Sequence, residues 1–395
     1  MALLAGLFCV GDVRAEGKSF VHPGMLSTEE DFSRARRLVA ANVSPAADSW
    51  RLLEKSQYAA ATYTPNAVQK VVRGNPSWAK DNYGLLYRDA AAAYQLAVRW
   101  KISGNVDYAN AAIKILDDWS GHLTDVIGTS DRYLASGLYG YELANAAEIM
   151  RTYPGWKNLP QFQTMMVKVF YQMNHDFITN HNTLGAAGLH YWANWDLANL
   201  ASMMAIGVLV DRHDIYKEAM TYVVQGSGNG AFPNAMWKVY PGTYGAVGLA
   251  QVQESGRDQG HSTLDIALIG VICQMAWNQH DDVFGFDNNL AAKASEYVAK
   301  YNLWNNVPWT NYTTADGSVQ TEISPASRGS TRPMWTLMYN HYVGIRGLSL
   351  PYTKKMMDKF GPEAGAYGAN SGGFDQLGYG SLLFSNYLET AVRKQ

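Results

Sequence analysis

The sequence is poor in cysteine, with only Cys9 and Cys273 among its 395 residues. A disulfide-stapled scaffold or a thiolate metal site needs several cysteines at characteristic spacings, so the sequence excludes both. Cys273 stands between Ile272 and Met275 in an apolar stretch, where a single cysteine is typical of a core position. No other motif indicates a bound metal or cofactor, and we expect none.

The sequence also lacks an excess of basic residues and a long apolar run. It has 32 Lys and Arg against 34 Asp and Glu, a net charge of −2, whereas nucleic-acid binders usually carry a basic excess. No stretch approaches the roughly 18 apolar residues of a membrane helix. Linkers rich in Pro, Ser or charge are missing too. These absences argue against nucleic-acid and membrane partners and favour one domain, which we also expect to be a monomer.

The first fifteen residues resemble a secretion signal. An apolar segment, residues 2–10, is followed by Val13-Arg-Ala15, a small-residue cleavage pattern, although the usual basic start is missing. We therefore expect residues 1–15 to be a signal peptide, residues 16–395 to form the mature domain, and the protein to be secreted or periplasmic.

Helical periodicity dominates the remaining chain. In residues 83–103, Leu86, Ala90 and Ala97 recur on one side, and Gly104 marks the end. Ser27 and Glu30 are spaced as a capping box. The same reasoning predicts further helices over residues 27–39, 106–119, 134–150, 160–177, 196–211, 213–224, 262–279, 288–301, 332–343 and 380–392. Regular strand alternation is scarce, so the sequence predicts an all-α chain whose sequential helical hairpins can close into an α/α toroid.

A charged, glycine-broken loop precedes the apolar helix at residues 262–279. The loop, residues 254–261, reads Glu-Ser-Gly-Arg-Asp-Gln-Gly-His. Ser262 and Asp265 are spaced as a capping box, which places His261 at or just before the helix start. Charges so close together need partners or water, so the loop is either an ion-pair network capping a helix or a functional site.

Three further patches carry candidate residues. Residues 190–196 are an aromatic run that includes Asn194, and Arg328 and Arg332 precede a predicted helix that carries Tyr339. Arg332 and Tyr339 are seven residues apart, nearly two helical turns, so their side chains are predicted to share a face. Each residue also has a structural interpretation: Asn194 as a helix cap, Arg332 as an ion-pair partner and Tyr339 as a core aromatic.

Asn, His, Arg and Tyr together suit one reaction. Removal of the proton beside a uronate carboxylate is difficult because negative charge develops next to an existing anion. An Arg, an Asn amide and a His can neutralise that carboxylate. A Tyr can take the C5 proton and return a proton to the departing O4, if a nearby cation lowers its pKa. The combination predicts β-elimination.

The sequence resembles polysaccharide lyases of the alginate lyase and glucuronan lyase type. The resemblance covers most of the chain after the signal and rests on residues 22–24 (His-Pro-Gly), 190–196 (His-Tyr-Trp-Ala-Asn-Trp-Asp), 254–261, 328–335 (Arg-Gly-Ser-Thr-Arg-Pro-Met-Trp), 339–342 (Tyr-Asn-His-Tyr) and 370–375 (Asn-Ser-Gly-Gly-Phe-Asp). It implies an incomplete α/α toroid that cleaves a 1,4-linked polyuronate and leaves an unsaturated uronate end. The long irregular stretches between the predicted helices would wall a groove at one end of such a toroid.

The resemblance also implies roles for individual residues. Asn194 and His261 would neutralise the carboxylate, Arg332 would bind it or tune the base, and Tyr339 would act as base and acid. Related lyases carry adjacent Asn and His, whereas Trp195 follows Asn194 here. Whether His261 shares the base role therefore stays open, as does the choice between the two arginines. Trp192, Trp195, Arg257 and Arg328 are the candidate substrate contacts.

Two other functions compete with a lyase. A glycoside hydrolase on the same toroid needs two carboxylates beside the scissile bond, and Asp196, Glu254 and Asp258 could supply them. A non-catalytic polysaccharide-binding protein would use only the aromatic loops. Glucuronan, mannuronan and guluronan differ in stereochemistry at one or two carbons, so the motifs do not select the polymer.

Overall fold

The computed structural model describes residues 19–181, 190–242, 247–365 and 374–392. The predicted signal peptide and residues 370–373 of the last motif lie outside these described residues. The helices are α1 (Glu29–Ala40), α2 (Ala46–Lys55), α3 (Gly84–Ser103), α4 (Val106–His122), α5 (Asp131–Met150), α6 (Leu159–Met165), α7 (Gln172–Asn180), α8 (Ala193–Leu209), α9 (His213–Gln225), α10 (Phe232–Ala235), α11 (Gln259–Asn278), α12 (Phe286–Asn302), α13 (Trp335–Tyr339), α14 (Pro351–Phe360), α15 (Gly380–Leu383) and α16 (Asn386–Val392).

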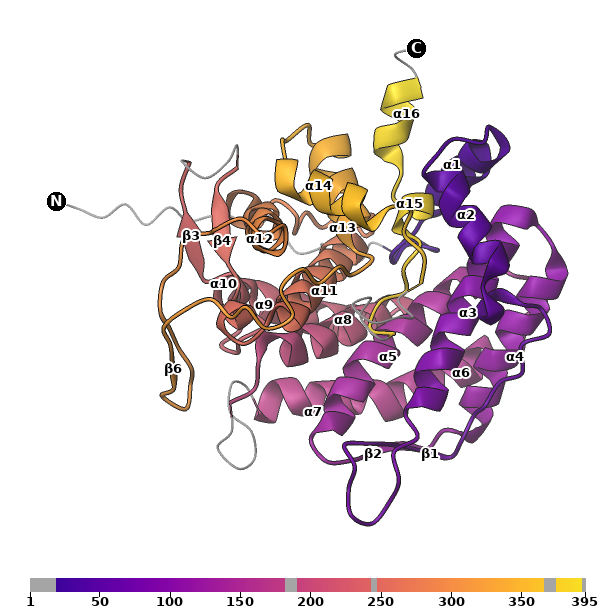
Figure 1. Ribbon diagram of the computed structural model, residues 1–395. Helices are drawn as coiled ribbons and strands as arrows, with labels where there is room; N and C mark the ends of the chain where they lie inside the picture. The colour runs from indigo at the N-terminus through magenta and orange to yellow at the C-terminus, as the bar shows by residue number, and fades with distance from the viewer. Residues whose placement is uncertain (1–18, 182–189, 243–246, 366–373, 393–395) are drawn as a thin grey trace.

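Five of these helices form an inner arc. Consecutive contacts run from α3 to α5, α8, α11 and α13, while α4, α9 and α12 pack outside against their neighbours (Figure 1). The helices α5, α8 and α11 are buried around nearly their whole circumference, as expected for helices at the centre of a large protein. Between the ends of the arc, α15 and α1 lie beside α13 and α3. The prediction of an all-α toroid is confirmed.

Small residues allow the central helices to approach closely. At Gly137 of α5, an added Cβ would lie 2.8 Å from the backbone carbon of Ala198 in α8. Real Cβ atoms do not come so close to backbone, so glycine is required where α5 crosses α8. The inner arc therefore depends on this contact.

Two predicted helix caps are wrong by a few residues. Thr28 and Asp31, not Ser27 and Glu30, form the capping box of α1. The helix α11 begins at Gln259, with Asp258 as its N-cap. A carboxylate that accepts hydrogen bonds from the first turn is as good a cap as a serine, and it moves the helix start upstream of the apolar run.

The predicted helix over residues 332–343 is also wrong at its start. It begins as α13 at Trp335, after Met334 with φ −145°, and continues as the π-helical segment η4 (Asn340–Ile345). The predicted helix over residues 380–392 is divided into α15 and α16 at Phe384. The helices α2 and α14 were not predicted from the sequence.

Three short two-stranded sheets join the helices. The strands β1 (Lys70–Arg73) and β2 (Asp125–Gly128) are parallel, with Arg73 opposite Gly128. The strands β3 (Lys238–Tyr240) and β4 (Leu249–Gln251) are antiparallel, as are β5 (Tyr312–Thr313) and β6 (Val319–Gln320). In the described ranges, no helix is long and apolar enough to cross a membrane.

Candidate active site

The start of α11 holds His261 in a fixed orientation. One carboxylate oxygen of Asp258 accepts the backbone N–H of His261 at 2.8 Å, and the other lies 2.6 Å from its Nδ1. A carboxylate at Nδ1 fixes the proton there, which leaves Nε2 as the acceptor. Nε2 has no hydrogen-bond partner among the described residues, and the side chain is 35% exposed. His261 is therefore held in one orientation with its second ring nitrogen accessible.

Asp258 stays ionised beside this histidine. Burial alone would raise the pKa of Asp258, but the hydrogen bonds from the side chain and backbone of His261, with the nearby charge of Arg257, lower it overall.

A buried carboxylate, Glu254, organises the neighbouring segments. Its Oε1 accepts the backbone N–H of Asn194 at 2.8 Å and the Nδ2 of the same residue at 2.6 Å, and its Oε2 accepts Nη1 of Arg257 at 2.8 Å. Asn194 is fully buried, so the structure ties it to Glu254 rather than exposing it to a substrate. Its predicted role as a neutraliser stays a prediction.

A second buried acid faces the same carboxylate. Burial raises the pKa of Asp265 well above its usual value, and the charge and hydrogen bond of Glu254 raise it further. Burial and the neighbouring carboxylate therefore both favour the protonated form of Asp265. Glu254 in turn accepts Nη1 of Arg257.

Arg332 joins the start of α11 to the segment after residue 373. Its Nε donates to the carbonyl of Gly260 and to Oγ1 of Thr263, both at 3.2 Å. Its Nη1 donates to the carboxylate of Asp375 and to the Oε1 of Gln376, both at 3.1 Å. The guanidinium is nearly buried, so it fixes the position of Asp375 beside His261.

Asp375 is the point at which several charges meet. Burial raises its pKa above the usual value, while the charges of Arg332, Arg73 and His261 act to lower it. These three side chains come from distant parts of the chain: β1, α11 and the segment before α13. The structure therefore brings two arginines and His261 from both halves of the toroid towards one carboxylate.

Arg73 was not predicted from the sequence. Its Nη1 donates to the phenol oxygen of Tyr139 at 3.2 Å, and its guanidinium lies 4.7 Å from the ring centroid of Tyr83. It forms no ion pair with the described residues, so its charge is available to a ligand. An arginine on a four-residue strand gives no local sequence signal, because only the fold brings it towards Asp375.

Tyr339 lies in different surroundings. Its ring packs edge-on against Tyr387 of α16, with centroids 5.3 Å apart, and Nζ of Lys354 in α14 lies 6.0 Å from its centroid. Arg332 precedes α13, so the prediction that it shares a helix face with Tyr339 is wrong. The structure brings together His261, Arg332 and Arg257, whereas the ring of Tyr339 contacts side chains of α14 and α16. Its role as base and acid stays a prediction.

The four predicted substrate contacts differ in their surroundings. Arg257 is 27% exposed and lies 5.2 Å from the ring of Trp192, so both belong to the site. Trp195 packs on Phe177 and Tyr191 instead. Arg328 donates to two carbonyls at the end of α12.

The carboxylates that a hydrolase would need are mostly buried. Asp196 and Glu254 are fully inaccessible, and only Asp258 is partly exposed. Burial raises the pKa of Asp196 to about 7, opposed by a hydrogen bond from the backbone of Gly230. A pair of carboxylates flanking a glycosidic bond is therefore not formed by these three.

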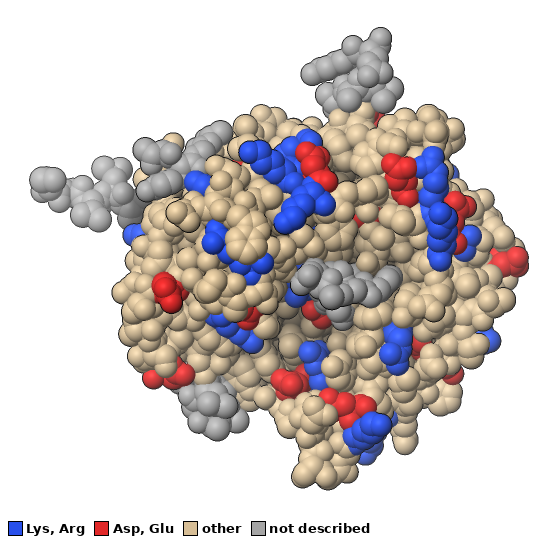
Figure 2. Space-filling view, viewed as in Figure 1, with Lys and Arg blue, Asp and Glu red and all other residues tan. Residues whose placement is uncertain are grey.

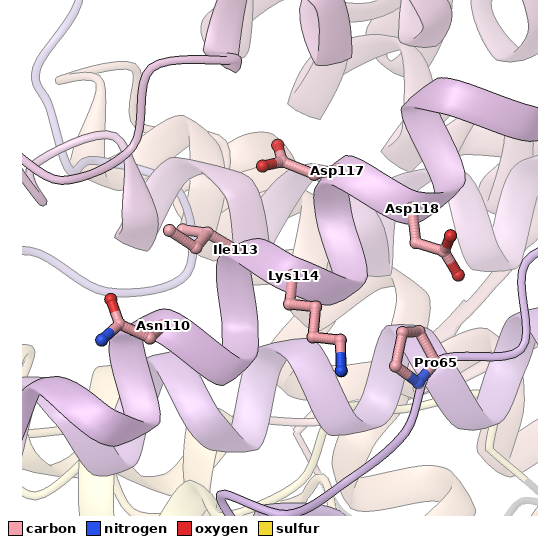
Figure 3. Close-up of a pocket in the computed structure, with 6 residues that line it drawn as sticks. All are labelled: Pro65, Asn110, Ile113, Lys114, Asp117 and Asp118. Atoms are coloured by element: carbon pink, nitrogen blue, oxygen red, sulfur yellow. The ribbon is translucent and has the colours of Figure 1, made fainter.

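One face of the molecule is hollowed, and a separate pocket lies on α4. Figure 2 shows a face with a central hollow, where basic and acidic side chains lie close together. A separate pocket of about 390 Å³ on α4 is lined by Lys114, Asp117, Asp118 and three other residues (Figure 3). Asp117 already accepts hydrogen bonds from Trp156 and Asn158, and two carboxylates against one lysine do not suit an acidic ligand.

Among the residues described, no group of three or more His, Cys, Asp or Glu side chains could hold a metal ion.

Comparisons with known proteins agree with a helical toroid that acts on a polysaccharide. The profile of the alginate lyase family matches residues 34–309. Alginate lyase A1-III from Sphingomonas species A1 has a similar structure, with a TM-score of 0.59 at 14% identity, over 92% of this chain and 97% of that one. A variant of alginate lyase A1-III complexed with a tetrasaccharide gives a TM-score of 0.60 at 13% identity, over 92% and 96%.

An alginate lyase from Bacteroides ovatus is also similar, with a TM-score of 0.59 at 12% identity, over 92% of this chain and 100% of that one. At these identities the structural likeness concerns the fold. No curated protein matches the sequence. The fold and the family profile define the protein as a polysaccharide lyase, which confirms the predicted class of enzyme. The chain belongs to the alginate lyase family.

Proposed function

We propose that the protein cleaves a 1,4-linked polyuronate, glucuronan or polymannuronate, by β-elimination. The observation that carries the proposal is the accessible His261, oriented by Asp258, among three arginines from separate segments. Cations placed where an enolate-like charge develops are the main requirement for removing the proton beside a carboxylate. The tetrasaccharide complex of alginate lyase A1-III supports a sugar chain as the ligand of this fold.

The proposed reaction has one base and several neutralising groups. Nε2 of His261 takes the proton from C5, the electron pair forms the C4–C5 double bond, and the C4–O4 bond breaks. The proton that His261 took from C5 then passes to O4, which becomes the anomeric hydroxyl at the new reducing end of the other fragment. Arg257 and Arg73 bind the carboxylate of the reacting uronate, and Arg332 holds Asp375 in place. Asn194 keeps Glu254, and thereby Arg257, in position.

The assignment based on sequence, in which Tyr339 is base and acid and His261 a neutraliser, stands beside this one. The contacts favour His261, because its Nε2 is accessible and its Nδ1 is bound to Asp258. The contacts of Tyr339 are with Tyr387 and Lys354. The two assignments predict different effects of the single variants, as described below.

We also propose that the enzyme acts as a secreted or periplasmic monomer on an acidic polysaccharide. The small-residue pattern that ends at Ala15 supports export. A secreted enzyme would meet polymers too large to enter a cell.

A substrate panel tests the proposed function. The purified protein is incubated in parallel with glucuronan, polymannuronate and polyguluronate, and both ultraviolet absorbance and new reducing ends are followed. We expect absorbance to rise in step with new ends on glucuronan or polymannuronate, because each elimination creates one conjugated double bond. New ends without absorbance would indicate hydrolysis, and no cleavage of any of the three would contradict the proposal.

A further inference from the structure

Trp304 occupies a backbone position that usually belongs to glycine. It follows the C-cap of α12, Leu303, with φ +65°. Its N–H donates to the carbonyl of Tyr301 at 3.0 Å, and the N–H of Asn305 donates to the carbonyl of Lys300 at 3.2 Å. These two bonds form a Schellman motif, in which the left-handed residue is commonly glycine because a Cβ is disfavoured there. A bulky aromatic residue at this position is an outlier.

Packing of the indole ring does not offset the disfavoured backbone conformation, because Trp304 is 67% exposed. A tryptophan normally contributes to stability by burying a large apolar area. Here the side chain combines a disfavoured backbone with an apolar surface in water. Strain that the fold does not need is a reason to look for a function at the residue that carries it.

Arg328 supplies a charge beside the ring. Its Nε donates to the carbonyl of Tyr301 at 2.9 Å and its Nη2 to that of Asn305 at 3.0 Å. Its guanidinium lies 5.0 Å from the ring of Trp304. The remaining nitrogen, Nη1, has no hydrogen-bond partner in the described part of the chain. The next residue is Gly329, where an added Cβ would lie 3.6 Å from the indole. The guanidinium, which also lies 3.8 Å from the ring centroid of Tyr301, is thus close to the exposed indole and adds a positive charge beside it.

This surface is joined to the loop that carries His261. The N–H of Gly329 donates to Oδ1 of Asn302 at 2.9 Å, and Nδ2 of Asn302 donates to Oε1 of Gln259 at 3.0 Å. The N–H of Gln259 donates to the carbonyl of Ala326 at 2.8 Å. Gln259 is the first residue of α11, two residues before His261. These hydrogen bonds tie the segments that carry Trp304 and Arg328 to the first turn of α11, on which His261 lies.

We propose that Trp304 and Arg328 form a distal subsite for the polyuronate chain. One sugar ring stacks on the indole, and its carboxylate pairs with Nη1 of Arg328. This inference rests on the proposed function and adds a binding position outside the reacting sugar. It also explains the conformation of Trp304, because the left-handed backbone holds the ring out from the surface.

The test compares Trp304→Gly and Trp304→Phe with the wild type. Glycine relieves the backbone, so Trp304→Gly should raise the unfolding temperature while it raises KM for the polymer by about two- to tenfold, the value of one aromatic contact. Trp304→Phe keeps a ring and should restore most of the affinity. As a matched control, Trp78→Gly removes another exposed tryptophan, 63% accessible, on the loop after β1, and should leave KM unchanged.

Two results would overturn the subsite. One is an unchanged KM in Trp304→Gly, and the other is a lower unfolding temperature, which would give the ring a structural role. Either result would leave the proposed function intact as long as the wild type eliminates polyuronate. A wild type inactive on every polyuronate would instead contradict the proposed function, and the subsite with it.

Discussion

Replacing Asp258 by asparagine separates the two tasks of this residue. In the wild type one oxygen caps α11 and the other binds Nδ1 of His261. Asparagine has one acceptor oxygen and one amide group. The oxygen can keep the cap, and Asn and Asp are nearly equal as N-caps, so the free energy of unfolding should change by only a few tenths of a kcal/mol from the cap. The amide, however, presents N–H to Nδ1.

An N–H donor at Nδ1 forces the ring of His261 into the other tautomer. Nε2 then carries the proton and cannot accept one from C5. A positioned general base contributes about 10²- to 10⁴-fold to a rate, so kcat of Asp258→Asn should fall by about that factor, or about 3 to 5 kcal/mol in activation free energy. Asp258→Ala should also lower kcat, because no acceptor then holds the proton on Nδ1 of His261, and should lose about 1 kcal/mol of stability with the cap.

The assay combines initial rates, from the absorbance of the unsaturated product, with thermal unfolding of both variants. Substantial turnover by a well-folded Asp258→Asn protein would refute the reasoning that His261 must be held as an Nε2 base.

The ionised state of Asp258 also predicts that stability depends on pH. Because its folded pKa is lowered, its contribution to stability is present above the ordinary pKa and is lost as pH falls through the folded value. Asp258→Asn should lack this loss.

Three further predictions concern the base, a buried acid and the helix packing. His261→Ala should lose at least about 100-fold in kcat, more than Tyr339→Phe, because only His261 is oriented by Asp258; a larger loss in a folded Tyr339→Phe protein would restore the tyrosine as base. Asp196 has a raised pKa of about 7, so the folded state is progressively destabilised as pH rises from about 4 to 7. The unfolding temperature of Asp196→Asn should therefore rise relative to that of the wild type as the pH increases from 5 to 8. A difference between the two unfolding temperatures that does not change with pH would contradict the raised pKa of Asp196. Gly137→Ala should destabilise the protein by about 1 to 3 kcal/mol in denaturant unfolding, because its Cβ would meet the backbone of α8; unchanged stability would mean that the two helices can separate at little cost.

The sequence predicts the helices well where a local signal marks them. Gly104 ends α3 in the left-handed conformation that its position suggests, and the apolar periodicity of residues 262–279 corresponds to most of α11. The cap of α11 was misplaced because Asp258, Ser262 and Asp265 offer similar local chemistry. Only the structure shows which of them accepts the first-turn N–H.

The candidate site was predicted in part. His261, Arg257 and Arg332 lie together because two of them share one loop and the third is bonded to Gly260. The contribution of Arg73 follows from the parallel pairing of β1 with β2, and strands of four residues carry too little alternation to be recognised. Similarly, the start of α13 at Trp335 depends on packing. The prediction from helical spacing that Arg332 and Tyr339 share a helix face was wrong because Arg332 lies before the helix begins.

The most direct test of the central claim is to run the cleavage in water enriched in heavy oxygen and to weigh the products by mass spectrometry. Elimination adds no water, so the account predicts unsaturated fragments with no heavy oxygen incorporated by the cleavage itself, once exchange at reducing ends is measured in a control. Saturated fragments that carry one heavy oxygen for each bond cleaved would show hydrolysis and contradict the account.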